Sequence, residues 1–190
     1  LCNSLFAMSA GDKILYPSFG LGISGGNFKA IDGQDLGLLI SGDSTMYNNP
    51  SPEWSFAYNL GIGLDYFITN NVALSAGLYY ENRPCLIVYE KNTASNDFEV
   101  EFDFSFLSIP IGVRYYFEML FLGGGLYYGK LLSDDATVKA DYTVDVQLED
   151  THDDIGLFID FGFSHQLSET GNIIVFARYK RGLTYVYDAE

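Results

Sequence analysis

The sequence predicts an all-β protein, an antiparallel up-and-down transmembrane β-barrel. Three observations predict it: the composition, a period of two in the apolar residues, and the unequal lengths of the connections. Aromatic residues make up 16% of the 190 residues and 20 are glycine, whereas the Ala, Leu, Glu and Lys surplus of a helical bundle is absent. Hydrophobic residues reach 48% and charged residues 18%, which excludes disorder of the whole chain. This length fits one domain.

The alternation of apolar and small residues predicts the strands. Leu60, Ile62 and Leu64, for example, alternate with Gly61 and Gly63, and a period of two gives a strand two unlike faces. The same pattern recurs along the chain and indicates seven strands. They begin near Phe19, Tyr58, Val72, Leu107, Leu120, Ile155 and Ile173.

The connections between these strands are unequal in a regular way. The turns at 69–71, 118–119 and 168–172 are short, whereas 29–55, 84–100 and 133–153 are long, polar and acidic. All short turns therefore fall at one end of the sheet. Short periplasmic turns, long outer loops and aromatic residues near both ends are the pattern of barrels in outer membranes.

The ends of the chain affect the strand count. Residues 1–10 resemble the end of a secretory signal, with small residues at Ala7, Ser9 and Ala10, so we expect a single barrel domain at 11–190. Single-chain bacterial barrels have an even number of strands. We therefore expect eight strands in the intact protein, the last one missing from this chain. The alternative is that 36–41 supplies the eighth strand.

The two faces of the predicted strands differ in chemistry. The residues expected to face lipid are Leu60, Ile62, Leu74, Ile111, Val113, Leu157 and Ile159. The opposite face, which would line the lumen, carries a charge network of Asp65, Glu81, Arg83, Arg114, Asp160, Arg178 and Lys180. Their heights predict two paired layers, Asp65 with Arg114 and Asp160 with Arg178. Because an eight-stranded barrel is only wide enough for side chains, we favour a structural plug over an ion path.

The charge balance is strongly acidic. Ten basic and 25 acidic residues give a formal charge of −15, which repels the phosphates of nucleic acids. One acidic loop is expected to hold Asp134, Asp135, Asp141, Asp145, Glu149, Asp150, Asp153 and Asp154. We interpret it mainly as a solvated surface. Divalent cations that bridge to lipopolysaccharide, or a basic surface partner, are the alternatives.

Catalysis has little support in the sequence. His165 follows Ser164, so the two side chains point to opposite faces of a strand, and His152 lies in the acidic loop. No zinc spacing and no phosphate-binding glycine loop is present. We therefore predict a protein that is not an enzyme and that has no cofactor or metal.

Three segments carry a resemblance to a known family. They are the run Phe106 to Phe117, the glycine-rich run Leu122 to Gly129, and Ala177 to Leu183. The chain resembles the outer-membrane β-barrel domain family of Gram-negative bacteria, whose members are similar to small OmpA- and OmpX-type barrels. The resemblance implies the bacterial outer membrane, contact with its lipid and lipopolysaccharide, and no shared catalytic residues.

These observations predict a barrel with a plugged lumen and a structural or surface-interaction role through its acidic outer loops. Two alternatives stay open. One is a narrow porin-like channel, and the other is a soluble lipocalin-like barrel that binds an apolar ligand and turns its apolar face inward.

Overall fold

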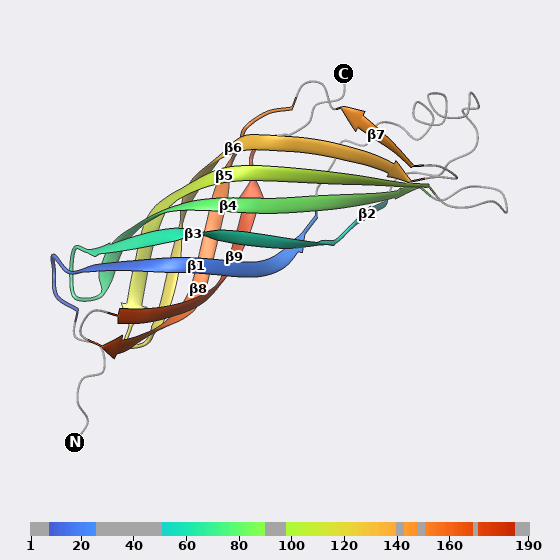
Figure 1. Cartoon of the computed structure of the whole chain (residues 1–190). Coiled ribbons are helices and arrows are strands. Elements are labelled where there is room, and N and C mark those ends of the chain that lie inside the picture. Colours follow the sequence, from blue (N-terminus) through green and yellow to red (C-terminus); the bar gives the residue numbers. More distant parts are fainter. Residues whose placement is uncertain are drawn as a thin grey trace.

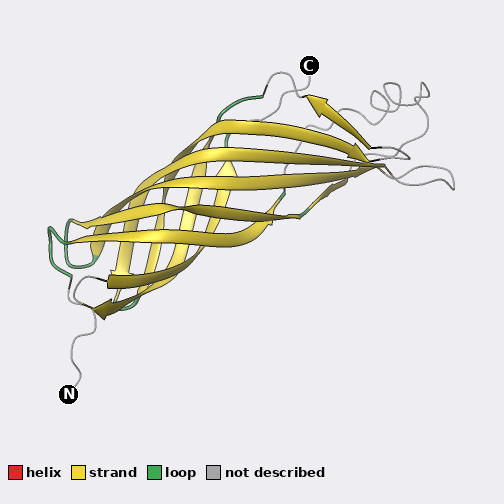
Figure 2. Cartoon of the chain, in the orientation of Figure 1, coloured by secondary structure: helices red, strands yellow, loops and turns green. Residues whose placement is uncertain are grey.

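The computed structural model describes residues 8–25, 51–89, 98–139, 143–147, 151–168 and 171–184, which form nine antiparallel strands (Figure 1). The strands are β1 (Lys13–Ser24), β2 (Ser51–Glu53), β3 (Ser55–Phe67), β4 (Val72–Tyr89), β5 (Phe98–Phe117), β6 (Leu120–Lys139), β7 (Thr143–Gln147), β8 (Asp154–Ser168) and β9 (Gly171–Gly182). Figure 2 shows strands and loops only, and no helix in the described ranges is long and apolar enough to cross a membrane.

Seven of the strands form one curled sheet in the order β1-β3-β4-β5-β6-β8-β9. The two short strands lie off this path, with β2 paired to β4 and β7 paired to β6. Glu118, at the tight turn between β5 and β6, has a φ of 57°, the positive φ that the first central residue of a two-residue hairpin turn adopts. The predicted meander of seven strands is confirmed, and β2 and β7 add to it.

The sheet is almost closed on itself. Its edge strands β1 and β9 lie close together, but no hydrogen-bonded register joins them within the described residues. Because five strands lie between these edges and neighbouring strands alternate in direction, β1 and β9 run in the same direction. The expected eighth strand is not among the described residues, and 36–41 lies outside them.

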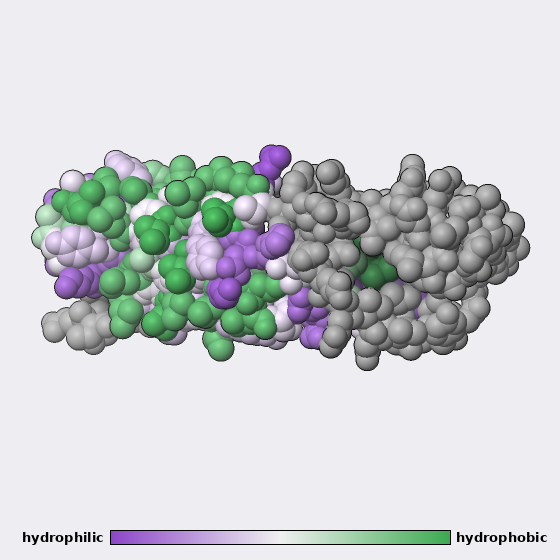
Figure 3. Space-filling view, turned by 90° about the horizontal axis from the view of Figure 1, so that it is seen from above, coloured by the Kyte–Doolittle hydropathy of each residue, from purple (hydrophilic) through white to green (hydrophobic). Residues whose placement is uncertain are grey.

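The wall of the barrel turns its apolar side chains outward. All seven residues expected to face lipid are exposed, from 46% for Leu157 to 62% for Ile111. Figure 3 shows a largely apolar surface over this part, interrupted by a hydrophilic patch. The outward row of β5 runs from residue 107 to residue 117, which matches the about 9–11 residues of a tilted spanning strand. A lipocalin-like barrel would have the opposite arrangement.

Aromatic rings fill the lumen by lying against glycines. A Cβ placed on Gly63 would lie 2.2 Å from Cζ of Tyr16, and one on Gly156 would lie 2.5 Å from the hydroxyl of Tyr127. Both rings are buried. The glycines that alternate with apolar residues therefore leave the space that these rings occupy.

Two of the long connections are shorter than the sequence indicates. The expected loops 84–100 and 133–153 are largely strand, because β4, β5 and β6 continue beyond the apolar band as an outer extension, residues 82–89, 98–106 and 132–139. Here the faces are exchanged: Val100 and Phe102 are buried on the inner face, whereas Glu99 and Asp103 are exposed outside. Polar residues on the outer face fit a sheet that is surrounded by water. They also give these segments the composition of a loop, which is why the sequence did not indicate strands here.

Candidate functional site in the lumen

The short-turn end of the lumen is closed by an apolar cluster. Rings of Phe67 and Tyr116 lie 5.0 Å apart, and those of Tyr116 and Phe121 lie 5.2 Å apart. The buried members of this cluster are Ile14, Tyr16, Phe67, Ala73, Tyr116 and Phe121, with Met8, Ile174 and Phe176 packed against them. Residues 1–7 of the expected signal remnant lie outside the described residues. The side chains of this cluster therefore fill the lumen at its short-turn end.

Arg114 is the centre of an inner ionic layer directly above this cluster. Its Nη1 donates to Asp65 at 2.8 Å and to the hydroxyl of Tyr16 at 2.6 Å, and its Nη2 donates to Asp160 at 2.7 Å. The side chains of Arg114 and both aspartates have no exposed surface. Tyr116 also donates a hydrogen bond to Asp65. Such charge-assisted bonds are the strong class of hydrogen bond, and each of the two aspartates accepts at least one from Arg114.

Arg178 completes the inner layer from β9. Its Nε donates to Oδ1 of Asp160 at 2.6 Å and its Nη2 to Oδ2 at 2.8 Å. The two residues face each other in the β8–β9 register, in agreement with the pairing that the hairpin predicts. The expected separation into two layers is wrong at this point. Arg114 is long enough to reach both aspartates, so Asp65, Asp160 and both arginines form one network.

A second, outer ionic layer lies nearer the long-loop end. Arg83 pairs with Glu81 and with Asp154, the latter at 2.5 Å. Lys180 pairs with the other oxygen of Glu81 at 2.5 Å and donates to Ser108 at 2.8 Å. The hydroxyl of Tyr127 donates to Asp154 at 2.7 Å. Two acids and two bases again balance each other.

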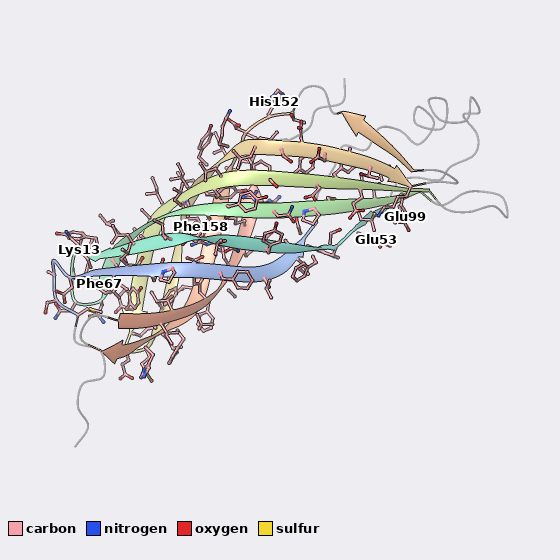
Figure 4. All side chains as sticks on the ribbon, viewed as in Figure 1. Lys13, Glu53, Phe67, Glu99, His152 and Phe158 are labelled. Carbon is pink, nitrogen blue, oxygen red and sulfur yellow. The ribbon has the colours of Figure 1, made fainter. Side chains whose placement is uncertain are left out.

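Aromatic rings separate the two layers. The guanidinium of Arg178 lies 4.6 Å from the ring centre of Phe158 and 5.2 Å from that of Tyr79. Phe158 comes from the middle of β8, between the strands seen in Figure 4. Lys180 lies 4.3 Å from the ring centre of Tyr127. The cations therefore contact ring faces as well as carboxylates, which stabilises charge away from water.

The residues expected in one acidic loop lie in several places. Asp154 opens β8, is 3% exposed and belongs to the outer ionic layer, so its assignment to the loop is wrong. Asp134 and Asp135 lie within β6 because the strand extends beyond the band, and Asp145 lies in β7. Asp134 accepts a hydrogen bond from Thr151 at 2.6 Å. The described residues do not include Asp141, Glu149 and Asp150.

Asp153 fixes the chain just before β8. Its carboxylate accepts hydrogen bonds from the Tyr128 hydroxyl at 2.5 Å and from the Leu131 backbone N–H at 3.0 Å, and Lys130 lies 3.2 Å away. The hydrogen bond from Tyr128, and then that from Leu131, hold the pKa of Asp153 below its usual value. The carboxylate is thus charged at neutral pH.

Sequence reasoning found seven of the charged lumen residues but missed their polar neighbours. Tyr16, Tyr116 and Ser108 all point inward by strand parity, yet tyrosine and serine occur on either face of a strand, so parity alone does not mark them as partners. Ser164 is buried, while His165 lies on the outward face as expected. No three His, Cys, Asp or Glu side chains of the described residues could hold a metal ion together.

Comparison with known proteins gives the family. The model of the family described as outer membrane protein beta-barrel domain matches residues 16–188, which is most of the chain. No curated protein and no solved structure matches. The matched range includes all of β3, β4, β5, β6, β8 and β9, most of β1, and every residue of the two ionic layers. The chain therefore belongs to the outer membrane protein beta-barrel domain family, and its place is the bacterial outer membrane.

Proposed function

We propose that the protein is an outer-membrane barrel with a closed lumen, which neither conducts ions nor catalyses a reaction and has a structural or surface-interaction role. One observation carries the proposal. The lumen holds two ionic layers, each made of two acids and two bases with direct pairs, above a cluster of apolar side chains.

The balance of charge in the layers supports closure. An ion pathway works when its fixed charges are free to exchange a water shell or a passing ion. Here Arg114 and Asp160 have no exposed side-chain surface and are bonded to each other. Opening the lumen would separate buried ion pairs, and breaking one such pair costs about 3–5 kcal/mol.

Ser108 and Lys180 are the lumen residues most similar to a catalytic nucleophile and its base, and their surroundings argue against catalysis. Ser108 is fully buried and accepts a hydrogen bond from Lys180. A lysine that activates serine must give up its proton first. Lys180 is instead held in an ion pair with Glu81, and Ser108 is closed off from the surface by the surrounding side chains.

A narrow channel is the competing function, and one observation favours it. Oδ1 of Asp65 and Oδ1 of Asp154, one in each ionic layer, are buried and make no hydrogen bond with the described residues. Buried carboxylate oxygens without protein partners are positions where water binds. A channel through the lumen would bring water to both oxygens.

Planar-bilayer conductance of the full chain separates the two functions. We expect no reproducible current steps from the protein with its native lumen. A porin of known conductance, reconstituted in the same bilayers, is the positive control. Steady steps from the unmodified protein would refute the closed lumen.

At the long-loop side, we propose contact with lipopolysaccharide, through divalent cations, as the surface interaction. Exposed Asp135 and the other acids of the outer extension are the described part of this surface. Negative groups close to a phosphorylated membrane surface repel it unless cations lie between them. Removal of divalent cations with EDTA should therefore lower, without abolishing, the amount of lipopolysaccharide that the purified barrel retains.

A further inference from the structure

The same three-residue pattern occurs twice on the lipid-facing surface. Near the long-loop ends of β6 and β9, a tyrosine and a basic residue occupy neighbouring outward positions, and an exposed leucine follows two residues later, at the register shift of β6 and just after the end of β9. The two sets are Tyr128, Lys130 and Leu132, and Tyr179, Arg181 and Leu183. All six side chains are exposed. Each basic side chain thus has a large apolar residue on both sides of it along its strand.

The two basic residues lie close to one another across the barrel wall. Only β8 separates β6 from β9, with Tyr128 opposite Ile155 and Arg181 opposite Leu157. Strand spacing and rise place their Cα atoms about 16 Å apart, two strands across and about four residues along. Two long flexible side chains at this distance are able to bind one large headgroup together.

Their place in the wall is unusual for a charge. Four of the eight basic side chains in the described residues point into the lumen, Lys13 lies at the opposite end, and Lys139 lies on the outer extension. Lys130 and Arg181 alone among the described basic residues interrupt the outward apolar rows near the long-loop end. A cation near the interface costs little compared with one at the bilayer midplane, and its side chain can reach the level of the lipid headgroups.

Both cations have donors available. Lys130 is 59% exposed, its ammonium carries three N–H groups, and its Nζ lies 3.2 Å and 3.3 Å from the two carboxylate oxygens of Asp153. Arg181 is exposed and makes no salt bridge within the described residues. Asp153 is itself held by Tyr128 and Leu131, so it positions Lys130 near the rim. Neighbouring tyrosines suit the polar boundary of a bilayer.

We propose that Lys130 and Arg181 form a binding site for the phosphate groups of a phosphorylated glycolipid in the outer leaflet. The glycolipid places its acyl chains along the apolar rows of β6, β8 and β9 and its phosphates against the two cations. This contact is direct and differs from the cation-bridged contact at the acidic surface. It rests on the outer-membrane location and does not depend on a closed lumen, because neither side chain faces the lumen.

Native mass spectrometry of the detergent-solubilised full chain, titrated with purified rough lipopolysaccharide in EDTA, tests the site. The test variant is Lys130→Gln with Arg181→Gln. The matched control is Lys13→Gln with Lys139→Gln, which removes the same charge from the other end and from the extension. We expect the test variant to bind about tenfold or more weakly, as the loss of two charge-assisted contacts implies, and the control to bind within about twofold of the native chain.

The same titration with dephosphorylated lipopolysaccharide identifies the recognised group. The native chain should then bind as weakly as the test variant does. Equal affinities of the native chain and the test variant for the phosphorylated lipid would overturn the site, and so would an equal loss in the control. Equal displacement by phosphatidylglycerol would overturn the assignment to a glycolipid. Conductance, which reports the closed lumen, is measured separately and should not change.

Discussion

Replacing Arg114 by leucine should test whether the lumen depends on pairing or only on net charge. The substitution removes the cation from a fully buried site and leaves Asp65 with tyrosine as its remaining partner, while Asp160 keeps Arg178. Breaking a buried ion pair by removing one partner costs about 3–5 kcal/mol. We therefore expect the free energy of unfolding to fall by that amount in Arg114→Leu.

Two double variants make the comparison sharp. Arg114→Leu with Asp65→Leu keeps the Asp160–Arg178 pair, whereas Arg114→Leu with Asp160→Leu leaves Asp65 and Arg178 without their partners. Both variants keep the layer neutral. We expect the first within about 2 kcal/mol of the native protein, since replacing a whole pair by apolar residues is nearly neutral, and the second about 6–10 kcal/mol less stable.

Reversible urea unfolding in detergent micelles, followed by tryptophan fluorescence and by heat-modified mobility on gels, measures these differences. Arg178→Leu with Asp160→Leu is a further check, because it leaves Arg114 bonded to Asp65. It should be more stable than Arg178→Leu alone. Equal stabilities of the two Arg114 double variants would refute the pairing argument, since net charge would then account for the stability.

Three further changes have defined outcomes. Gly63→Val should displace the ring of Tyr16 and lower the free energy of unfolding by about 1–3 kcal/mol, because a Cβ at Gly63 would lie 2.2 Å from that ring. The control Gly22→Val has open space around the new side chain and should leave the unfolding curve unchanged. Ile62→Arg should lower the unfolding free energy in lipid vesicles by about 2–4 kcal/mol if Ile62 lies near the bilayer midplane, and an unchanged value would place it elsewhere. Asp153→Asn should free the Lys130 ammonium, and native mass spectrometry should then detect tighter binding of lipopolysaccharide.

The strands of the barrel wall could be predicted from the sequence because the same inside–outside pattern of residue types holds in each of them. Lipid selects large apolar residues outward, and the narrow lumen holds paired charges together with glycines and the aromatic rings that lie against them. Leu60, Ile62 and Leu64 against Gly61 and Gly63 follow this rule without exception. The face of each charged lumen residue follows from the same parity.

Strand ends and cross-strand reach could not be predicted in the same way. Glu99, Glu101 and Asp103 alternate with Val100 and Phe102 as regularly as any strand, but their polar face is outside, so the segment has the composition of a loop. The reach of Arg114 to Asp160, two strands away on β8, depends on how tightly the sheet curls. Curvature is a property of the closed assembly and leaves no local pattern in the chain.

The distribution of charge follows from these two environments. The two ionic layers contain four acids and four bases, so the remaining 21 acidic and six basic residues carry the whole formal charge of −15. In the lumen an unpaired charge is costly, and neutrality is therefore enforced pair by pair. In water, outside the wall, repulsion between acids is screened within about 10 Å. The acidic surplus can consequently change with little effect on the lumen, and surface interactions and barrel stability are free to vary separately.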